Sequence, residues 1–226
     1  EAPAPDPSIP AMKQNNATFL KMHESFLARG RSGPIGLLFL GDSITWRWWT
    51  APKLWEAHYG KDQPANFGLP GDGTQHILWR IEHGELDGIH PKVVVLLAGT
   101  NNAHRNSAAQ IVAADTKIVR EIRERIPGVK VLLLAIFPRG PHRNGNGTSD
   151  DGVHSMEVIR AANAGLAKLD DGVNVRFLDI GAKFLGPDGK IPPGIMADQL
   201  HPTVAGYQIW ADAMQPLLDD MLRPSR

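Results

Sequence analysis

Three residue types that can together activate a serine hydroxyl lie near opposite ends of this 226-residue sequence. Ser43 follows the apolar run GLLFLG over 36–41, and Asp198 and His201 lie close to the C-terminus. A serine hydroxyl is a weak nucleophile until a positioned base, commonly histidine, removes its proton. An aspartate can fix the tautomer of that histidine and stabilise its protonated form. The pattern therefore predicts acyl transfer with Ser43 as nucleophile, His201 as base and Asp198 as its orienting carboxylate.

Acyl transfer also requires hydrogen-bond donors at the position where the oxyanion forms. The candidates are the backbone N–H groups of Ser43 and Gly71 and the side-chain amide of Asn101. Gly71 lies in the turn Gly-Leu-Pro-Gly-Asp-Gly over 68–73, where a missing Cβ allows close backbone approach. Asn101 follows the apolar run 92–99, and a side-chain amide is a recognised oxyanion donor.

Each of these residues taken alone has a purely structural explanation. Ser43 could cap a helix, Gly71 could serve a turn, and Asn101 or Asp198 could cap a connection. His201 could lie in a solvated loop. The functional interpretation therefore rests on their joint occurrence in this order at predicted strand ends, because single motifs often arise by chance.

Apolar runs that suit buried parallel strands alternate with segments of helical periodicity. The predicted strands cover 36–41, 65–68, 92–99, 130–138 and 175–180. The predicted helices cover 11–29, 107–126 and 154–169, with a last helix beginning at the cap Thr203. Such alternation predicts an α/β fold with a parallel sheet, because parallel neighbours need crossover helices. Sites in such folds lie at the carboxyl ends of the strands, where the candidate residues fall.

The chain is expected to form a single domain over 11–226, preceded by a proline-rich tether over 1–10. The first ten residues contain four prolines and begin with Glu, which suggests a stretch exposed after a leader is removed. We therefore expect a secreted or periplasmic protein, with the cytoplasm as the alternative. The polar stretch 140–152 is expected to be a surface loop.

Composition limits the partners of the protein. The 24 Lys+Arg residues balance the 24 Asp+Glu residues, which argues against a nucleic-acid partner. The chain has no cysteine and no apolar run of roughly 20 residues, so we expect neither a disulfide nor a membrane insertion. His76, His104 and His142 lack metal-ligand spacing, and no metal site is expected. The oligomeric state is left open.

Four segments resemble the successive conserved blocks of the SGNH (GDSL-like) hydrolases. They are Phe39-Leu-Gly-Asp-Ser-Ile44, Asn66-Phe-Gly-Leu-Pro-Gly-Asp72, Leu97-Ala-Gly-Thr-Asn-Asn102 and Asp198-Gln-Leu-His-Pro202. The four letters of the family name would fall on Ser43, Gly71, Asn101 and His201. The stretches 71–80 and 137–140 further resemble the platelet-activating-factor acetylhydrolase catalytic-subunit group within that family. The resemblance implies a flavodoxin-like three-layer α/β/α sandwich with five parallel strands in the order 2-1-3-4-5, no metal or organic cofactor, and hydrolysis of short acyl esters.

The expected substrate is a small-molecule or polysaccharide ester, with an acetylated carbohydrate favoured. Trp46, Trp48 and Trp49 follow Ser43 closely and could stack on sugar rings or line an acyl pocket; core packing is their structural alternative. Asp42 and His104 are further candidates for the pocket, although Asp42 is expected to brace its loop. The alternatives are a phospholipid or platelet-activating-factor-like acetylhydrolase, a short-chain lipase, and a non-catalytic flavodoxin-like binding module. Arg80 could orient a substrate, but it is expected to pair with Glu82 or Glu85 as part of the structure.

Overall fold

The computed structural model describes residues 4–143 and 147–224, and a five-stranded parallel sheet forms its centre. The strand order is β2-β1-β3-β4-β7. The strands are β1 (Leu37–Gly41), β2 (Pro64–Gly68), β3 (Val93–Leu97), β4 (Lys130–Leu134) and β7 (Val175–Leu178). Because β7 is the fifth strand of this sheet along the chain, the predicted order 2-1-3-4-5 is confirmed.

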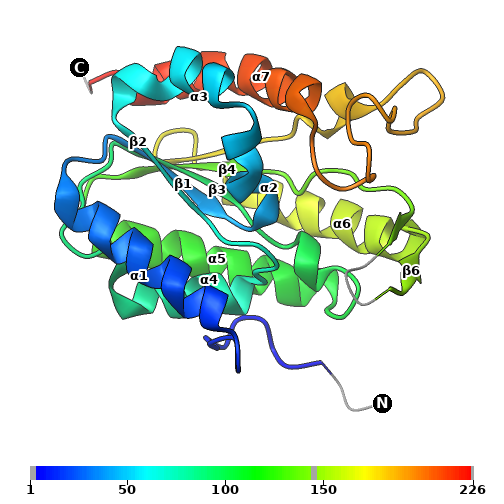
Figure 1. The fold of residues 1–226 in the computed structure, drawn as a ribbon, viewed down its shortest axis with the longest axis horizontal. Helices are drawn as coiled ribbons and strands as arrows, with labels where there is room; N and C mark the ends of the chain where they lie inside the picture. Colours follow the sequence, from blue (N-terminus) through cyan, green and yellow to red (C-terminus); the bar gives the residue numbers. More distant parts are fainter. Residues whose placement is uncertain (1–3, 144–146, 225–226) are drawn as a thin grey trace.

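Helices cover both faces of the sheet and make three layers (Figure 1). One face packs against α1 (Ala17–Ser32), α4 (Thr74–Arg80), α5 (Ala108–Arg125) and α6 (Val153–Leu166). The other packs against α3 (Pro52–Tyr59) and α7 (Val204–Leu222), with the short α2 (Ser43–Trp46) beside them. Alternate residues of each central strand enter opposite cores, as in β1, where Leu38 and Leu40 face α1 and Leu37 and Phe39 face α7.

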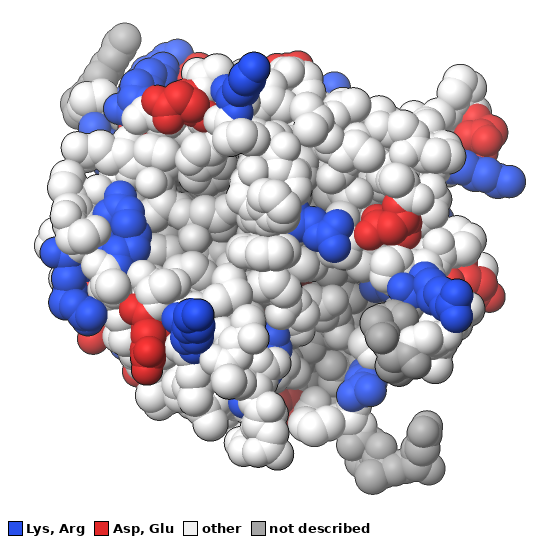
Figure 2. All heavy atoms as spheres, in the orientation of Figure 1, with Lys and Arg blue, Asp and Glu red and all other residues white. Residues whose placement is uncertain are grey.

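Short helical turns complete the connections between these elements. Single 3₁₀ turns cover Arg47–Thr50, Gly60–Asp62, Thr100–Asn102, Ala167–Leu169 and Gly181–Phe184. A π-helical turn over Ile81–Glu85 continues α4 and is kinked at His83 and Gly84. The face of the molecule in Figure 2 carries basic and acidic side chains interspersed with each other.

Helix starts follow the local capping chemistry. The first helix begins at Ala17 rather than at residue 11, because the Asn16 side chain accepts a hydrogen bond from the Phe19 N–H at 2.9 Å. The predicted caps Ser107 and Thr203 are confirmed, since each hydroxyl accepts a backbone N–H three residues later. The prediction was wrong for 11–16 because apolar periodicity continues upstream of the cap.

The proline-rich N-terminal segment lies against the domain over its described residues. Three side chains of the domain donate hydrogen bonds to its backbone carbonyls: Asn106 to Pro5 at 3.1 Å, Thr74 to Pro7 at 3.0 Å, and Lys117 to Ser8 at 3.0 Å. Pro7 is buried. The division into a tether over 1–10 and a domain over 11–226 stays a prediction, but residues 4–10 make extended and specific contacts.

The stretch 140–152, predicted as a surface loop, contains a small antiparallel hairpin formed by β5 (His142–Arg143) and β6 (Ser149–Asp150). Residues 144–146 of the stretch lie outside the described residues. The Asp150 carboxylate accepts from the Gly152 N–H at 2.8 Å and pairs with Arg139 at 3.2 Å, which fixes the base of the hairpin. Among residues 4–143 and 147–224, no helix is both long and apolar enough to cross a bilayer.

Candidate active site

A chain of two short hydrogen bonds joins Ser43, His201 and Asp198. Ser43 is the first residue of α2, immediately after β1, and its Oγ lies 2.8 Å from His201 Nε2. His201 Nδ1 lies 2.6 Å from Asp198 Oδ2. The three side chains come from segments 158 residues apart, and they meet because Ser43 and the loop before α7 lie at the same edge of the sheet.

The tautomer of His201 follows from the state of Asp198. Burial opposes ionisation of Asp198, but hydrogen bonds from the side chain and backbone of His201 outweigh it and hold the pKa of Asp198 below its usual value. An ionised carboxylate can only accept hydrogen bonds, so Nδ1 of His201 must carry a proton. In the neutral imidazole Nε2 is then free to accept the proton of Ser43, as a general base requires.

The loop that carries Asp198 and His201 is held in one conformation. Asp198 Oδ1 accepts from the N–H groups of Leu200 at 3.0 Å and His201 at 2.7 Å. Gln199 adopts a left-handed φ of 62°, its carbonyl accepts from the Gly140 N–H at 2.9 Å, and its side chain donates to the Ile191 carbonyl. These contacts fix the position of the Asp198 carboxylate relative to the His201 imidazole.

The loops after β1, β2 and β3 lie side by side at the carboxyl edge of the sheet. Gly41 pairs in register with Gly68 of β2 and Leu97 of β3, and the Leu69 N–H donates to the Gly41 carbonyl at 3.1 Å. A Cβ on Gly68 would lie 2.2 Å from the Trp46 nitrogen, so only glycine allows α2 to approach β2 this closely. Ser43, Gly71 and Asn101 therefore lie on adjacent loops, as predicted.

Gly71 and Asn101 line a common cavity of about 400 Å³. Gly71 has a left-handed φ of 76°, which explains the glycine in this turn. One N–H of the Asn101 side-chain amide donates to the Asp72 carbonyl at 2.9 Å, which orients the amide and leaves its second N–H available. The cavity is also lined by Ala4, Pro5, Gly73, Gln75, His76, Asn102, His104, Arg105 and Asn106.

A fully buried arginine ties the strand ends together behind this cavity. Arg80 donates from Nε to Asp72 Oδ2 at 2.8 Å and from Nη2 to the carbonyls of Gly41 and Phe67, both at 3.1 Å. Its Nη1 bonds to Glu85, which confirms the predicted pairing with that residue and not with Glu82. Although burial alone would lower the pKa of Arg80, the two carboxylates raise it, so the guanidinium stays charged.

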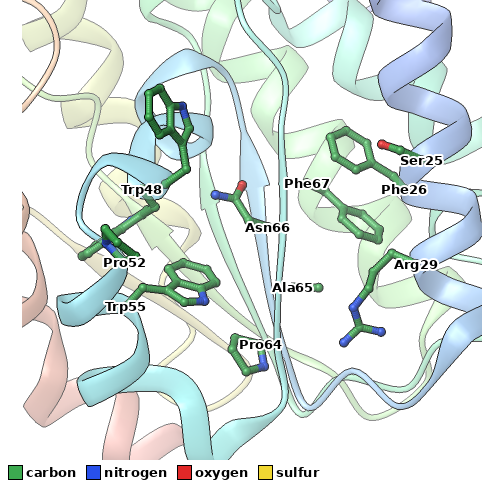
Figure 3. A pocket seen from close by; sticks show the side chains of 11 residues that line it. Ser25, Phe26, Arg29, Trp48, Pro52, Trp55, Pro64, Ala65, Asn66 and Phe67 are labelled. Atoms are coloured by element: carbon green, nitrogen blue, oxygen red, sulfur yellow. The ribbon is translucent and has the colours of Figure 1, made fainter.

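The tryptophans near Ser43 occupy different environments. Trp48 is buried in an aromatic cluster with Tyr59, Tyr207 and Trp210, as its structural alternative predicted. Trp46 is half-buried against the exposed Trp49. Trp48 also lines a groove of about 380 Å³ along β2, together with Trp55 and residues of α1 (Figure 3). Neither the Ser43–His201–Asp198 chain nor Gly71 and Asn101 line that groove.

His104 is exposed and lines the cavity with Gly71 and Asn101, and its role as a pocket residue stays a prediction. Burial of part of the imidazole lowers the pKa of His104, and the positive charges of Arg105 and Arg139 lower it further. A neutral histidine at this position could donate or accept a hydrogen bond to a substrate oxygen.

Sequence reasoning missed His142, which contacts the hydrogen-bonded chain from the hairpin stretch. Its Nδ1 lies 2.8 Å from the Asp198 carbonyl oxygen, and its ring packs edge-on against His201 with centroids 6.3 Å apart. Because a carbonyl only accepts, Nδ1 of His142 is the donor. No local sequence signal marked this contact, since it depends on how the 140–152 stretch folds back over the loop at 198–201.

Asp42 braces the loop as predicted, since its Oδ1 accepts from the Ile44 N–H at 2.9 Å and caps α2. The side chain is fully buried, and Oδ2 has no hydrogen-bond partner among the described residues. Burial, opposed by the Ile44 hydrogen bond and reinforced by the charge of Asp72, raises the pKa of Asp42 from 3.8 to about 7. The carboxyl therefore keeps its proton in mildly acidic solution.

This raised pKa predicts a pH-dependent stability. Between pH 4 and 7 the unfolded chain loses the Asp42 proton that the folded protein retains, so the free energy of unfolding falls by up to about 1.4 kcal/mol per pH unit. Asp42→Asn keeps the capping oxygen and cannot ionise, so its stability should decline less steeply across this window. Urea unfolding at pH 4, 5.5 and 7 measures both slopes, with the exposed Asp87→Asn as control. Equal slopes for wild type and Asp42→Asn would contradict the assignment.

Within the described residues, no group of three or more His, Asp or Glu side chains could hold a metal ion. The arrangement instead combines a serine hydroxyl, a histidine base, an oriented carboxylate and adjacent hydrogen-bond donors. These are the components of serine-dependent acyl transfer.

Comparison with known proteins gives the family. The sequence profile of the GDSL-like Lipase/Acylhydrolase family matches residues 39–209. Platelet-activating factor acetylhydrolase IB subunit alpha1 of Homo sapiens is 35% identical over 218 residues, which cover 96% of this chain and 90% of the relative.

Solved structures share the fold at low sequence identity. A GDSL-like lipase from Bacteroides thetaiotaomicron superposes with a TM-score of 0.71 and 17% identity, covering 88% of this chain and 97% of that chain. A carbohydrate acetylesterase family member from Sinorhizobium meliloti gives a TM-score of 0.64 at 16% identity, covering 82% and 98%.

Fold and site thus define an α/β ester hydrolase. The chain belongs to the GDSL-like Lipase/Acylhydrolase family, as its sequence blocks predicted.

Proposed function

We propose that this protein is a serine esterase that hydrolyses acetyl and other short acyl esters through Ser43, His201 and Asp198. The observation that carries the proposal is the unbroken chain from Ser43 Oγ to His201 at 2.8 Å and from His201 to Asp198 at 2.6 Å. A non-catalytic binding module is the weaker alternative for two reasons. The chain belongs to an acylhydrolase family, and a binding module has no need for a histidine base beside a serine hydroxyl.

The reaction proceeds in two halves. His201 Nε2 takes the proton of Ser43 while Oγ attacks the ester carbonyl carbon, and the carbonyl oxygen becomes an oxyanion. The tetrahedral intermediate collapses, and His201 returns the proton to the departing alcohol. Water then attacks the acyl-enzyme with His201 again as base, and the carboxylic acid leaves with Ser43 restored.

The oxyanion is held by the N–H groups of Ser43 and Gly71 and by the Asn101 amide. Support comes from the loop arrangement, because Gly71 and Asn101 line one cavity and Asn101 is oriented by its bond to the Asp72 carbonyl. Fixed donors of this kind cost no reorganisation when the charge develops.

Asn101→Ala should lower kcat for p-nitrophenyl acetate by about 100- to 1,000-fold with a smaller change in KM, because the lost donor acts chiefly in the transition state. Steady-state kinetics measure the two constants. Asn174→Ala, on the partly exposed turn before β7, is the matched control and should retain wild-type kinetics. A kcat for Asn101→Ala equal to that of the wild type would show that Asn101 does not stabilise the oxyanion.

For the alcohol side of the ester we favour a carbohydrate. The cavity beside Gly71 is lined by the amide of Gln75, the imidazole of His104 and the guanidinium of Arg105, which suit a hydroxyl-rich group. Trp48 does not contribute to this proposal, because its side chain packs in the core.

The second candidate is a phospholipid acetyl ester. Relatives that match 96% of the chain at 35% identity are named platelet-activating factor acetylhydrolase subunits. The polar cavity is compatible with the charged headgroup of such a lipid as well as with a sugar.

A competition assay separates the two candidates. Acetylated xylan, acetylated monosaccharides and a short-chain acetyl phospholipid are each offered against p-nitrophenyl acetate, with Ser43→Ala measured in parallel. The proposal predicts the highest kcat/KM for an acetylated sugar. A phospholipid preferred by tenfold or more would instead select the second candidate, and no hydrolysis of any ester would reject the proposed function.

A further inference from the structure

Lys13, three residues after the proline-rich N-terminal segment, binds the turn that carries Gly71. Lys13 Nζ donates to the Pro70 carbonyl oxygen at 2.7 Å and lies 2.6 Å from Asp72 Oδ1. Its side chain is only 13% exposed, and the ammonium lies 5.4 Å from the centre of the Phe19 ring. A lysine held this firmly beside a backbone carbonyl is not explained by the Ser43–His201–Asp198 chain.

The Pro70 carbonyl belongs to the same peptide group as the Gly71 N–H. A trans peptide is planar, and its C=O and N–H point in opposite directions. Because Lys13 binds the carbonyl from one side, the Gly71 N–H must point to the other. A charged donor on the carbonyl also polarises the peptide and strengthens its N–H as a hydrogen-bond donor.

The same ammonium fixes the next residue of the turn. The carboxylate of Asp72 is fully buried and lies between two cations, Lys13 on Oδ1 and Arg80 on Oδ2 at 2.8 Å. The Asp72 carbonyl accepts from the Asn101 amide. Lys13 therefore contacts the residues on both sides of Gly71, and one of them, Asp72, orients Asn101.

The N-terminal segment places Lys13 at this position. Upstream of Lys13 the segment is bound at Pro5, Pro7 and Ser8 by side chains of the domain, and the Ala11 N–H donates to the Gln75 carbonyl at 3.0 Å. The segment runs beside the start of α4, which directly follows the turn at Gly71 (Figure 1).

We propose that Lys13 is a positioning residue of the oxyanion hole, which holds the Pro70–Gly71 peptide so that the Gly71 N–H faces the developing oxyanion. The proposal rests on the proposed function of Ser43 and extends it to the N-terminal segment. Lys13 itself does not touch the substrate; it acts through the peptide it binds. Its loss should therefore weaken transition-state binding more than substrate binding.

The test compares three variants of the full chain with p-nitrophenyl acetate. Lys13→Met keeps the aliphatic stem and removes the charge, Lys13→Arg restores a cation, and the exposed Lys21→Met of α1 is the matched control. Lys13→Met should lower kcat by about 10- to 100-fold, less than the loss of a whole donor, with KM within about threefold of wild type. Lys13→Arg should recover part of kcat, and Lys21→Met should not differ from wild type.

A second readout separates positioning from a purely structural role. An alkylboronic acid that forms a tetrahedral adduct with Ser43 mimics the transition state, so its inhibition constant should rise in Lys13→Met by the same factor as kcat/KM falls. Thermal unfolding is measured alongside. If Lys13→Met is unfolded at the assay temperature, Lys13→Gln takes its place; it keeps a donor without the charge, so kcat should fall by a smaller factor, and the boronate inhibition constant should rise by the factor by which kcat/KM falls.

The outcomes distinguish this inference from the function on which it depends. Active wild type, inactive Ser43→Ala and unchanged kcat in Lys13→Met would overturn the role of Lys13 and leave the esterase intact. A folded variant with reduced kcat but unchanged boronate affinity would also overturn it. Wild type that hydrolyses no ester would reject the proposed function and the role of Lys13 with it.

Discussion

Ser43→Ala should reduce kcat for p-nitrophenyl acetate by at least about 10⁴-fold, because the substitution removes the Oγ atom that forms the covalent intermediate. The methyl group of alanine fits where the Cβ of serine lies, and Asp42 rather than Ser43 caps α2, so the fold should not change. The variant should therefore unfold at the same temperature as the wild type while its turnover approaches the uncatalysed rate.

The matched control is Ser32→Ala at the exposed end of α1, whose hydroxyl donates to the Arg29 carbonyl one turn earlier. It should retain full activity. Turnover by purified Ser43→Ala within tenfold of wild type would show that another group is the nucleophile, and the account of the site would fail.

His201→Ala should produce a loss of similar size, because an unactivated serine hydroxyl is a poor nucleophile at neutral pH. The two residues act as one unit through their 2.8 Å hydrogen bond, so their effects should not add. The double variant Ser43→Ala/His201→Ala should be about as slow as either single variant.

Steady-state kinetics on the two single variants and the double variant measure this coupling. His58→Ala is a suitable control, since His58 is partly buried on α3 and bonds to Gln215 away from the site. Independent losses that multiply in the double variant would mean that His201 does not act on Ser43. Full activity in His201→Ala would exclude it as the base.

Much of the fold was predictable because its signals are local. Runs such as 92–99 are apolar on both faces, which is typical of a strand buried between two helical layers, and caps such as Ser107 mark helix starts by their own hydrogen bonds. Once the strands are ordered, the carboxyl edge brings together Ser43, Gly71 and Asn101 without further information.

The supporting contacts around the site were less predictable because they depend on tertiary packing. A proline-rich start reads as a tether, yet Pro7 is buried, and Lys13 reaches a turn 57 residues away. His142 meets Asp198 only because the 140–152 stretch folds into a hairpin and returns to the loop before α7. Trp48 illustrates the reverse case, since it lies close to Ser43 in the sequence but packs in the core.

The most direct test of the central claim is to trap the acyl-enzyme. The protein is mixed with p-nitrophenyl acetate, quenched in acid within the first turnover, and analysed by intact-mass measurement and peptide mapping. We predict one acetyl group per chain, located on Ser43, absent from Ser43→Ala and formed far more slowly in His201→Ala. Turnover accompanied by an acetyl group on another residue, or by none under conditions where deacylation limits the rate, would contradict a mechanism through Ser43.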